Sequence, residues 1–233
     1  MLMAHGPAPV HRPHRRRRGL SIVELLVGVA IGLIVAQGAL SLFVRNITAS
    51  RRLLYETRLN QDLRAAADLV ARDLRRAGYW GNAIQGTNAV GATAATALNP
   101  YSAVDTTSAS QITYEFSRDG TENNTLDGAE QFGFRLSSGA LQMQTDNGSW
   151  TDITNSQALT ITSFTVTPTT TTLPLGNLCF KTCAPGAPNC PSVTVRSYAI
   201  LLRGQAVADS NIRRDLRSTV RMRNDQLAGI CPV

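Results

Sequence analysis

The sequence RRRRGLSIVELLVGVAIGLIVAQGALSLFV, residues 15–44, decides the fold of this chain. Four arginines come first, and Glu24 is then the only charged residue before Arg45. Residues 25–44 are uncharged, and at about 1.5 Å rise per residue they form a helix about 30 Å long, enough to span the hydrocarbon core of a bilayer. Arginines before an apolar helix hold that end in the cytoplasm, so we expect the rest of the chain to cross the membrane.

Residues 1–19 form a basic leader rich in proline and arginine. Such a composition cannot bury enough apolar surface to offset its ordering entropy. The chain has 23 basic and 16 acidic residues, a net charge of +7, but five basic residues lie in the leader, so 18 against 16, or +2, remain after it. All three histidines also lie there. A chain cut after Gly19 therefore has no imidazole for a catalytic triad, a metal site or acid–base catalysis.

Glu24 lies in the first turn of the apolar helix. An unpaired carboxylate costs around 2.5 kcal/mol or more at the bilayer centre, and less near its edge. Cleavage between Gly19 and Leu20 would place a cationic α-amino group about one helical turn from Glu24, at a helix end whose dipole also favours a carboxylate. Two other interpretations stay open: an uncleaved signal anchor, and a conventional signal peptide cut at Ala39.

Residues 17–27, RRGLSIVELLV, resemble the type III signal sequence of type IV pilins and type II secretion pseudopilins. The resemblance implies that prepilin peptidase cuts after Gly19 and that Leu20, the new N-terminal residue, is N-methylated. It also implies that Glu24 pairs with the N-terminus of a neighbouring subunit during assembly. Leu20 stands where this class usually has phenylalanine.

The apolar run is expected to continue as one long helix. Residues 20–44 are its transmembrane or assembly part, and residues 45–77 its amphipathic second half, uninterrupted by glycine or proline. Apolar residues spaced by three or four positions mark one face of this second half: Leu59, Leu63, Ala66, Val70, Leu74 and Ala77. Gly78 is placed to end the helix. Gly28 and Gly32 form a GxxxG pattern that permits close helix contact but is also frequent by chance.

Residues 78–233 are expected to form a β-rich head with a cysteine-containing C-terminal region, because alternation replaces helical spacing. The predicted strands are residues 111–117, 132–136, 141–144, 159–166 and 193–202, with 218–222 a weaker candidate. Residues 82–110 have few large apolar side chains and are predicted to form a surface loop. The fold class is therefore α+β: a pilin-like arrangement of one long N-terminal helix packed on an antiparallel sheet.

Two short motifs resemble the PilW family of minor pilins: DLRRAGYWG at residues 73–81 and RSTVRMRN at residues 217–224. This resemblance implies a minor pilin that acts in type IV pilus assembly, in a priming or tip complex, and in the adhesion and motility that pili support. Its implied partners are prepilin peptidase, other minor pilins, the major pilin and the inner-membrane assembly platform. The implied location is the bacterial inner membrane, with a single-pass helix and a periplasmic head, and then the extracellular pilus.

Four cysteines, Cys179, Cys183, Cys190 and Cys231, lie on the exported side of the membrane in this topology. An even number of cysteines in an oxidising compartment favours two disulfides. We favour Cys183 with Cys190 and Cys179 with Cys231, and the other two pairings stay open. A zinc site of four thiolates is the alternative, although the spacing lacks the paired short knuckles of zinc ribbons.

Two other regions, an oxygen-rich segment and an arginine cluster, could bind a ligand, but each also has a simple structural explanation. Residues 119–128 are rich in oxygen ligands for calcium, but they lack EF-hand spacing and two hairpin turns explain them as well. The basic cluster of Arg213, Arg214, Arg217, Arg221 and Arg223 has no interleaved aromatic residues, which indicates a solvated face and no direct nucleic-acid binding. The chain has no nucleotide-binding, zinc-protease or hydrolase motif. We therefore expect no enzyme activity, metal or cofactor.

Two alternatives to a minor pilin remain. A type II secretion minor pseudopilin shares the leader and the fold. A signal-anchored periplasmic binding or sensor module, never cut at Gly19, is the alternative of a different class.

Overall fold

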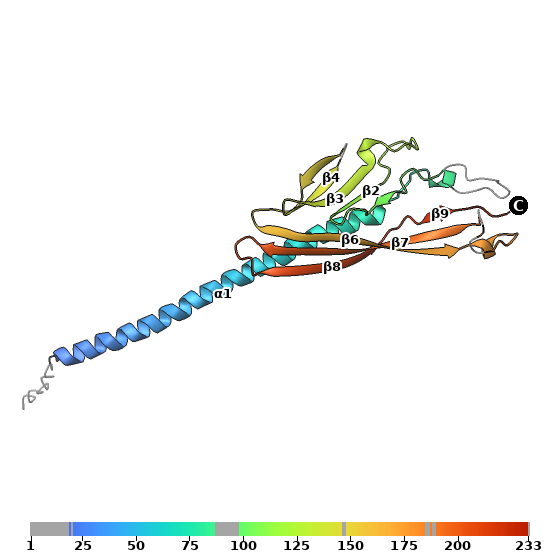
Figure 1. Ribbon diagram of the computed structural model, residues 1–233. Coiled ribbons are helices and arrows are strands. Elements are labelled where there is room, and N and C mark those ends of the chain that lie inside the picture. The colour runs from blue at the N-terminus through green and yellow to red at the C-terminus, as the bar shows by residue number, and fades with distance from the viewer. Residues whose placement is uncertain are drawn as a thin grey trace, which may run out of the picture. The chain divides into compact units, whose positions relative to one another are not determined.

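The computed structural model describes residue 19 and residues 21–86, 98–145, 148–184, 187 and 190–232 (Figure 1). Residues 1–18 and the predicted new N-terminus, Leu20, lie outside the described residues. The chain divides into two compact units, Met1–Ser50 and Arg51–Val233. Helix α1 (Ile22–Arg76) supplies the regular structure of the first unit and continues into the second, which also contains all the described strands.

Helix α1 has identifiable signals at both ends. It begins directly after Ser21, whose carbonyl accepts the first helical hydrogen bond from the N–H of Leu25 at 3.1 Å. It ends at Arg76, two residues before Gly78, which has a φ of +73°. Only glycine adopts this left-handed conformation without a steric cost, so it commonly stops a helix. The prediction that Gly78 ends the helix is confirmed.

The apolar stripe predicted for the second half of the helix is the face that the head covers. Its six residues are each at most 5% exposed: Leu59, Leu63, Ala66, Val70, Leu74 and Ala77. Ala67 and Ala71 widen the buried stripe. Helical stability in proteins comes mainly from such packing, so this half of α1 depends on the head for its stability. The predicted face is confirmed.

The first sheet, sheet A, has five antiparallel strands in sequential order. They are β1 (Val104–Asp105), β2 (Gln111–Glu115), β3 (Gln131–Ser137), β4 (Ala140–Thr145) and β5 (Ser149–Asp152). Buried aromatic residues on β2, on β3 and directly after β2 join the helix in the core, and the ring of Phe116, which follows β2, stacks on that of Phe132 with centroids 4.0 Å apart. Aromatic side chains bury more area than any others, so this face of sheet A contributes much of the core.

The second sheet, sheet B, is built on long strands that lie along α1 (Figure 1). Its order is β6 (Leu159–Pro174), β7 (Ser192–Ala206) and β8 (Arg213–Arg221), and the short β9 (Gln226–Ala228) also pairs with β7. Burial alternates along β7, as expected for a strand with one face on the core. At Gly204 an added Cβ would lie 3.1 Å from Cδ2 of Leu63, so glycine permits this close approach of strand and helix.

The structure confirms the α+β class and all the predicted strands, but the head has two antiparallel sheets where one was expected. β6 runs eight residues past its predicted end, through the sequence TPTTTTLP. Both faces of the strand are exposed in this extension, which is a strand because it pairs with β7. β1, β5 and β9 have two to four residues, too few to show alternation in the sequence. The prediction that residues 82–110 form a surface loop is wrong at Tyr101, because this side chain is fully buried. Residues 87–97 of that predicted loop lie outside the described residues.

Leu63→Ala tests the packing of α1 on sheet B. Leu63 is 1% exposed, so its truncation leaves a cavity and should cost about 2–5 kcal/mol of unfolding free energy. Leu54→Ala is the matched control, because Leu54 is 69% exposed on the same helix and should change stability by less than about 0.5 kcal/mol. Chemical denaturation of the full chain in detergent measures both, and equal losses would contradict this packing.

Glu115 at the end of β2 gives a test by pH. Burial, and to a smaller extent the neighbouring carboxylate of Glu130, raise the pKa of Glu115 above its ordinary value. Any stability linked to this shift is therefore present at acidic pH, below the unfolded-state pKa, and is lost as the pH rises through the folded-state pKa. Glu115→Gln, which cannot ionise, should raise the melting temperature at pH 7 and leave it unchanged near pH 3. A gain of the same size at both pH values would contradict the shift.

Candidate functional site: the processing motif, the apolar helix and the end of α1

The predicted cleavage motif precedes the helix. Gly19 is exposed and lies outside α1. Exposed, non-helical backbone is the kind of segment that proteases cut. Leu20, the predicted site of N-methylation, lies outside the described residues, so the roles of both residues stay predictions from the sequence.

Glu24 is in the first turn of α1 and is exposed. Within the described part of the chain no side chain forms an ion pair or a hydrogen bond with its carboxylate. The positive end of the helix dipole favours a carboxylate at this position but does not neutralise it. A cation for Glu24 therefore comes from outside the described residues, either from the part of the chain before the helix or from another molecule.

The first half of α1 exposes its apolar side chains on every face. Each described residue from Ile22 to Val44 is exposed, including leucines, isoleucines and Phe43. The helix is long and apolar enough to cross a membrane. Water is a poor solvent for so much contiguous apolar surface, so this half of α1 needs lipid or other protein around it. It is the candidate membrane anchor.

The small and polar residues in this half of the helix have simple local roles. An added Cβ on Gly28 or Gly32 would meet nothing within 4 Å, so packing within the described chain does not require glycine at either position. The hydroxyl of Ser41 donates to the Gly38 carbonyl at 2.8 Å, and that of Thr48 to the Val44 carbonyl at 2.9 Å. These bonds satisfy hydroxyls that an apolar environment would otherwise leave unpaired.

The two PilW-like motifs meet at the C-terminal end of α1. The backbone N–H of Arg223 donates to the carbonyl of Arg75 at 3.0 Å. The side-chain amide of Asn224 donates to the carbonyls of Arg76 and Ala77, at 3.2 and 3.0 Å. The last carbonyls of a helix have no partner inside it, so the C-terminal segment caps α1. Sequence reasoning found both motifs but did not predict that they touch.

A buried charged cluster lies one turn before this cap. Asp73 is 2% exposed; its carboxylate accepts a hydrogen bond from the Tyr114 hydroxyl at 3.0 Å and pairs with Arg76 at 3.0 Å. The guanidinium of Arg76 also lies over the ring of Phe116, 4.4 Å from its centroid. Burial, and secondly the Asp73 charge, raise the pKa of Tyr114 well above its ordinary value, which keeps this hydroxyl protonated as a donor. The cluster thus fixes the end of α1 against β2 through a satisfied carboxylate.

The four cysteines form two disulfides in the structure. Cys179 is bonded to Cys231, with Cα atoms 5.3 Å apart, and Cys183 to Cys190, with Cα atoms 5.9 Å apart. These are the pairs that the sequence analysis favoured. The first bond ties the C-terminal segment to the connection between β6 and β7, and the second closes a short loop within that connection. All four sulfurs are used in these bonds, which leaves no thiolate among them for a zinc site.

The other candidate sites are occupied by local contacts. In residues 119–128, Asp119 and Asn123 accept hydrogen bonds from backbone N–H groups within the loop, and Asp127 accepts one from the side chain of Asn123. Among the described residues no three carboxylate, histidine or cysteine side chains gather as a metal site would require. In the basic cluster, Arg214 pairs with Glu56 of α1 and Arg221 with Asp225, each at 2.7 Å. Internal ion pairs thus use part of the cluster's charge.

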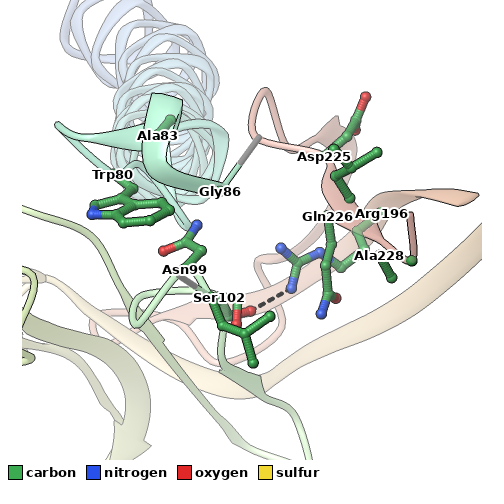
Figure 2. A pocket seen from close by; sticks show the side chains of 12 residues that line it. Trp80, Ala83, Gly86, Asn99, Ser102, Arg196, Asp225, Gln226 and Ala228 are labelled. Atoms are coloured by element: carbon green, nitrogen blue, oxygen red, sulfur yellow. Dashed lines mark hydrogen bonds between the residues drawn. The ribbon is translucent and has the colours of Figure 1, made fainter. Parts of the chain in front are cut away.

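One feature had no signal in the sequence. Arg196 on β7 is 8% exposed and lines a cavity beside Trp80, at the end of α1 (Figure 2). In the sequence it is one of the two arginines of β7, with Arg203, and nothing in the strand pattern shows which residues surround it. Its Nη1 donates a hydrogen bond to the carbonyl of Ser102 at 2.6 Å.

A cleavage motif, an exposed apolar helix and antiparallel sheets packed on the second half of that helix define a pilin-like protein. The chain belongs to the family described as prepilin peptidase-dependent protein B, whose model matches residues 52–222. Comparison with curated proteins and with solved structures finds no match. The matched segment covers most of the head and lies entirely after the leader, so the family assignment and the cleavage motif are independent indications of the same class. Prepilin peptidase is accordingly a partner of this protein.

Removal of each disulfide should show which one holds the head together. The Cys179–Cys231 bond spans 52 positions in the sequence and the Cys183–Cys190 bond spans 7. In the chain-entropy model these loops correspond to about 4 and about 2.5 kcal/mol. Replacing Cys179 and Cys231 by serine should therefore lower the unfolding free energy more than the matched double replacement at Cys183 and Cys190. Denaturant titration of the two variants tests this order, and the reverse order would contradict it.

Proposed function

We propose that this protein is a minor pilin of PilW type that takes part in type IV pilus assembly. The observation that carries the proposal is an apolar helix half, exposed on all sides, whose first turn holds a carboxylate with no partner among the described residues. A folded head follows the same helix, and the family match supports processing by prepilin peptidase. The protein acts as a structural subunit without enzyme activity.

The proposed mechanism follows the environment of the apolar helix. Before assembly, residues 22–44 lie in the inner membrane and the head lies in the periplasm. During assembly the helix moves from lipid into a fibre core made of other apolar helices, so its side chains exchange one apolar environment for another. Glu24 then pairs with the α-amino group of a neighbouring subunit, which offsets the cost of its charge in that core.

The proposed partners follow from this movement. The major pilin and other minor pilins supply the apolar helices around α1 and the amine for Glu24. The inner-membrane assembly platform extracts the subunit. A priming or tip position for this protein, and the adhesion and motility that depend on pili, come from the resemblance of residues 73–81 and 217–224 to PilW proteins.

Two alternatives have distinct consequences in cells. A type II secretion minor pseudopilin would share the cleavage and the helix, but deletion of its gene would abolish protein secretion and leave surface fibres intact. A minor pilin gives the opposite result. A signal-anchored binding or sensor module would remain in the membrane uncut, and neither fibres nor secretion would change.

Glu24→Ala should reduce incorporation of the protein into sheared surface fibres by at least about tenfold, because the carboxylate that recruits the neighbouring amine is gone. Glu24 lies in the first turn of α1, outside the unit Arg51–Val233, so the head should keep its melting temperature. Asp68→Ala is the matched control, since Asp68 is an exposed carboxylate further along α1, and its incorporation should equal that of the wild type. Equal incorporation of Glu24→Ala and wild type would contradict the mechanism.

A further inference from the structure

The chain after Met222 forms a segment that lies outside the hydrophobic core. Met222 is 1% exposed and is the last core residue in the sequence. None of the residues 223–232 that follow it is buried, and the core takes no described residue from them. Burial of apolar surface is the main driving force of folding, so the core is complete without this segment. We call residues 223–232 the C-terminal clasp.

Polar contacts position the clasp on the head. The N–H of Arg223 and the side-chain amide of Asn224 donate to carbonyls at the end of α1, at 3.0 to 3.2 Å. Asp225 pairs at 2.7 Å with Arg221, whose side chain is 62% exposed, and β9 adds three residue pairs with β7. Water competes for contacts of this kind, so each contributes little net stability. The polar contacts therefore hold the clasp weakly.

The closed clasp also contains an unfavourable feature. The Oδ1 atom of Asp225 is buried and has no hydrogen-bond partner among the described residues, while its Oδ2 accepts from Arg221. A buried acceptor without a partner costs free energy, which hydration recovers when the segment opens. The clasp therefore depends on a restraint other than its polar contacts.

That restraint is the disulfide between Cys231, in the clasp, and Cys179, in the connection between β6 and β7. Cys231 is exposed, whereas Cys179 is 7% exposed. Thiol–disulfide exchange begins when a thiolate attacks one sulfur of a disulfide, so access to Cys231 is sufficient. The other disulfide differs, because Cys183 and Cys190 are both half-buried and close only their own loop.

We propose that the Cys179–Cys231 disulfide is a redox-operated latch on the C-terminal clasp, and that Cys231 is the site at which a dithiol oxidoreductase opens it. The latch controls a segment that the core does not need, so its opening is a local change. The proposal goes beyond the minor-pilin function and does not depend on fibre formation.

The exchange balances as a two-electron transfer. A thiolate of the oxidoreductase attacks Sγ of Cys231, the bond to Cys179 breaks, and Cys179 leaves as a thiolate that takes up a proton. The second thiol of the oxidoreductase then attacks the mixed disulfide and releases Cys231 as a thiol. The protein's disulfide is reduced to two thiols, and the dithiol of the oxidoreductase is oxidised to a disulfide.

Opening the latch changes two structures that the clasp covers. The carbonyls of Arg75, Arg76 and Ala77 lose the donors that cap α1, so the last turn of the helix frays. Strand β9 leaves β7, so the backbone of Ser192 to Thr194 gains a free edge that another strand can pair with. Loss of the bond lowers the overall stability, as predicted above, but the native core stays formed.

Hydrogen exchange of the full chain in detergent tests whether the opening is local. Replacing Cys179 and Cys231 by serine should speed exchange at the N–H of Arg223 and in β9 by at least about tenfold, the mark of local opening. The amides of β3 and β4 should stay protected over the same labelling times. The matched double replacement at Cys183 and Cys190 should leave the clasp protected. Unchanged clasp exchange, or loss of protection throughout the head, would overturn the proposal.

A trapping experiment on the wild-type chain tests the site of attack. The probe is a thioredoxin whose second active-site cysteine is replaced by serine, because it forms a mixed disulfide that it cannot resolve. Peptide mapping should find the probe attached to Cys231. Attachment to Cys183 or Cys190 instead, or no attachment in the folded protein, would contradict the assignment.

The thiol state of the protein in its own cells decides whether the latch operates. Acid quenching stops exchange, and alkylation then marks free thiols before digestion. Part of the population should carry the label on both Cys179 and Cys231 and keep the Cys183–Cys190 bond. If every molecule in membranes and in sheared fibres keeps the Cys179–Cys231 bond, the latch is wrong. The minor-pilin function is judged separately, by fibre incorporation of Glu24→Ala.

Discussion

The apolar surface of residues 22–44 is the constraint on which the rest of this protein depends. Nothing in the described part of the chain covers it, and no described cation reaches Glu24. A helix of this composition is stable only in lipid or among other apolar helices. This half of α1 therefore requires a membrane or other apolar helices around it.

The head packs on the second half of α1 and leaves the apolar first half, residues 22–44, uncovered. The second half of α1 contributes an apolar stripe to two sheets, and its last carbonyls are capped by Arg223 and Asn224 from the other end of the sequence. The Cys179–Cys231 disulfide ties the segment after that cap to the connection between β6 and β7. The C-terminal segment thus has two anchors on the rest of the head. In the proposed assembly, these anchors would keep the head folded while the apolar half of α1 leaves lipid for the fibre.

Much of this could be predicted from sequence because the signals are local. The helix face from Leu59 to Ala77 and the stop at Gly78 follow from periodicity and from glycine's access to positive φ. The extension of β6 beyond Val166 could not be predicted, because an exposed run of threonines becomes a strand only through pairing with β7. The division into two sheets, the burial of Tyr101 and the surroundings of Arg196 depend on contacts between distant segments, which no local pattern records.

The processing site differs from the head in this respect. Gly19, Leu20 and Glu24 are informative in sequence because, in the proposed function, an enzyme and an assembly recognise them as a linear motif, to which the fold adds little. The head motifs at residues 73–81 and 217–224 become informative only when the structure shows that they cap the same helix end. Resemblance and geometry therefore support different parts of the account.

The most direct test of the central claim is the N-terminus of the protein isolated from membranes of cells with and without prepilin peptidase. Intact mass and N-terminal peptide sequencing should show a mature chain that begins at N-methylated Leu20, and only when the peptidase is present. A chain that keeps Met1 in the presence of the peptidase, or that begins near Ala39, would remove the amine that Glu24 requires and would contradict the account.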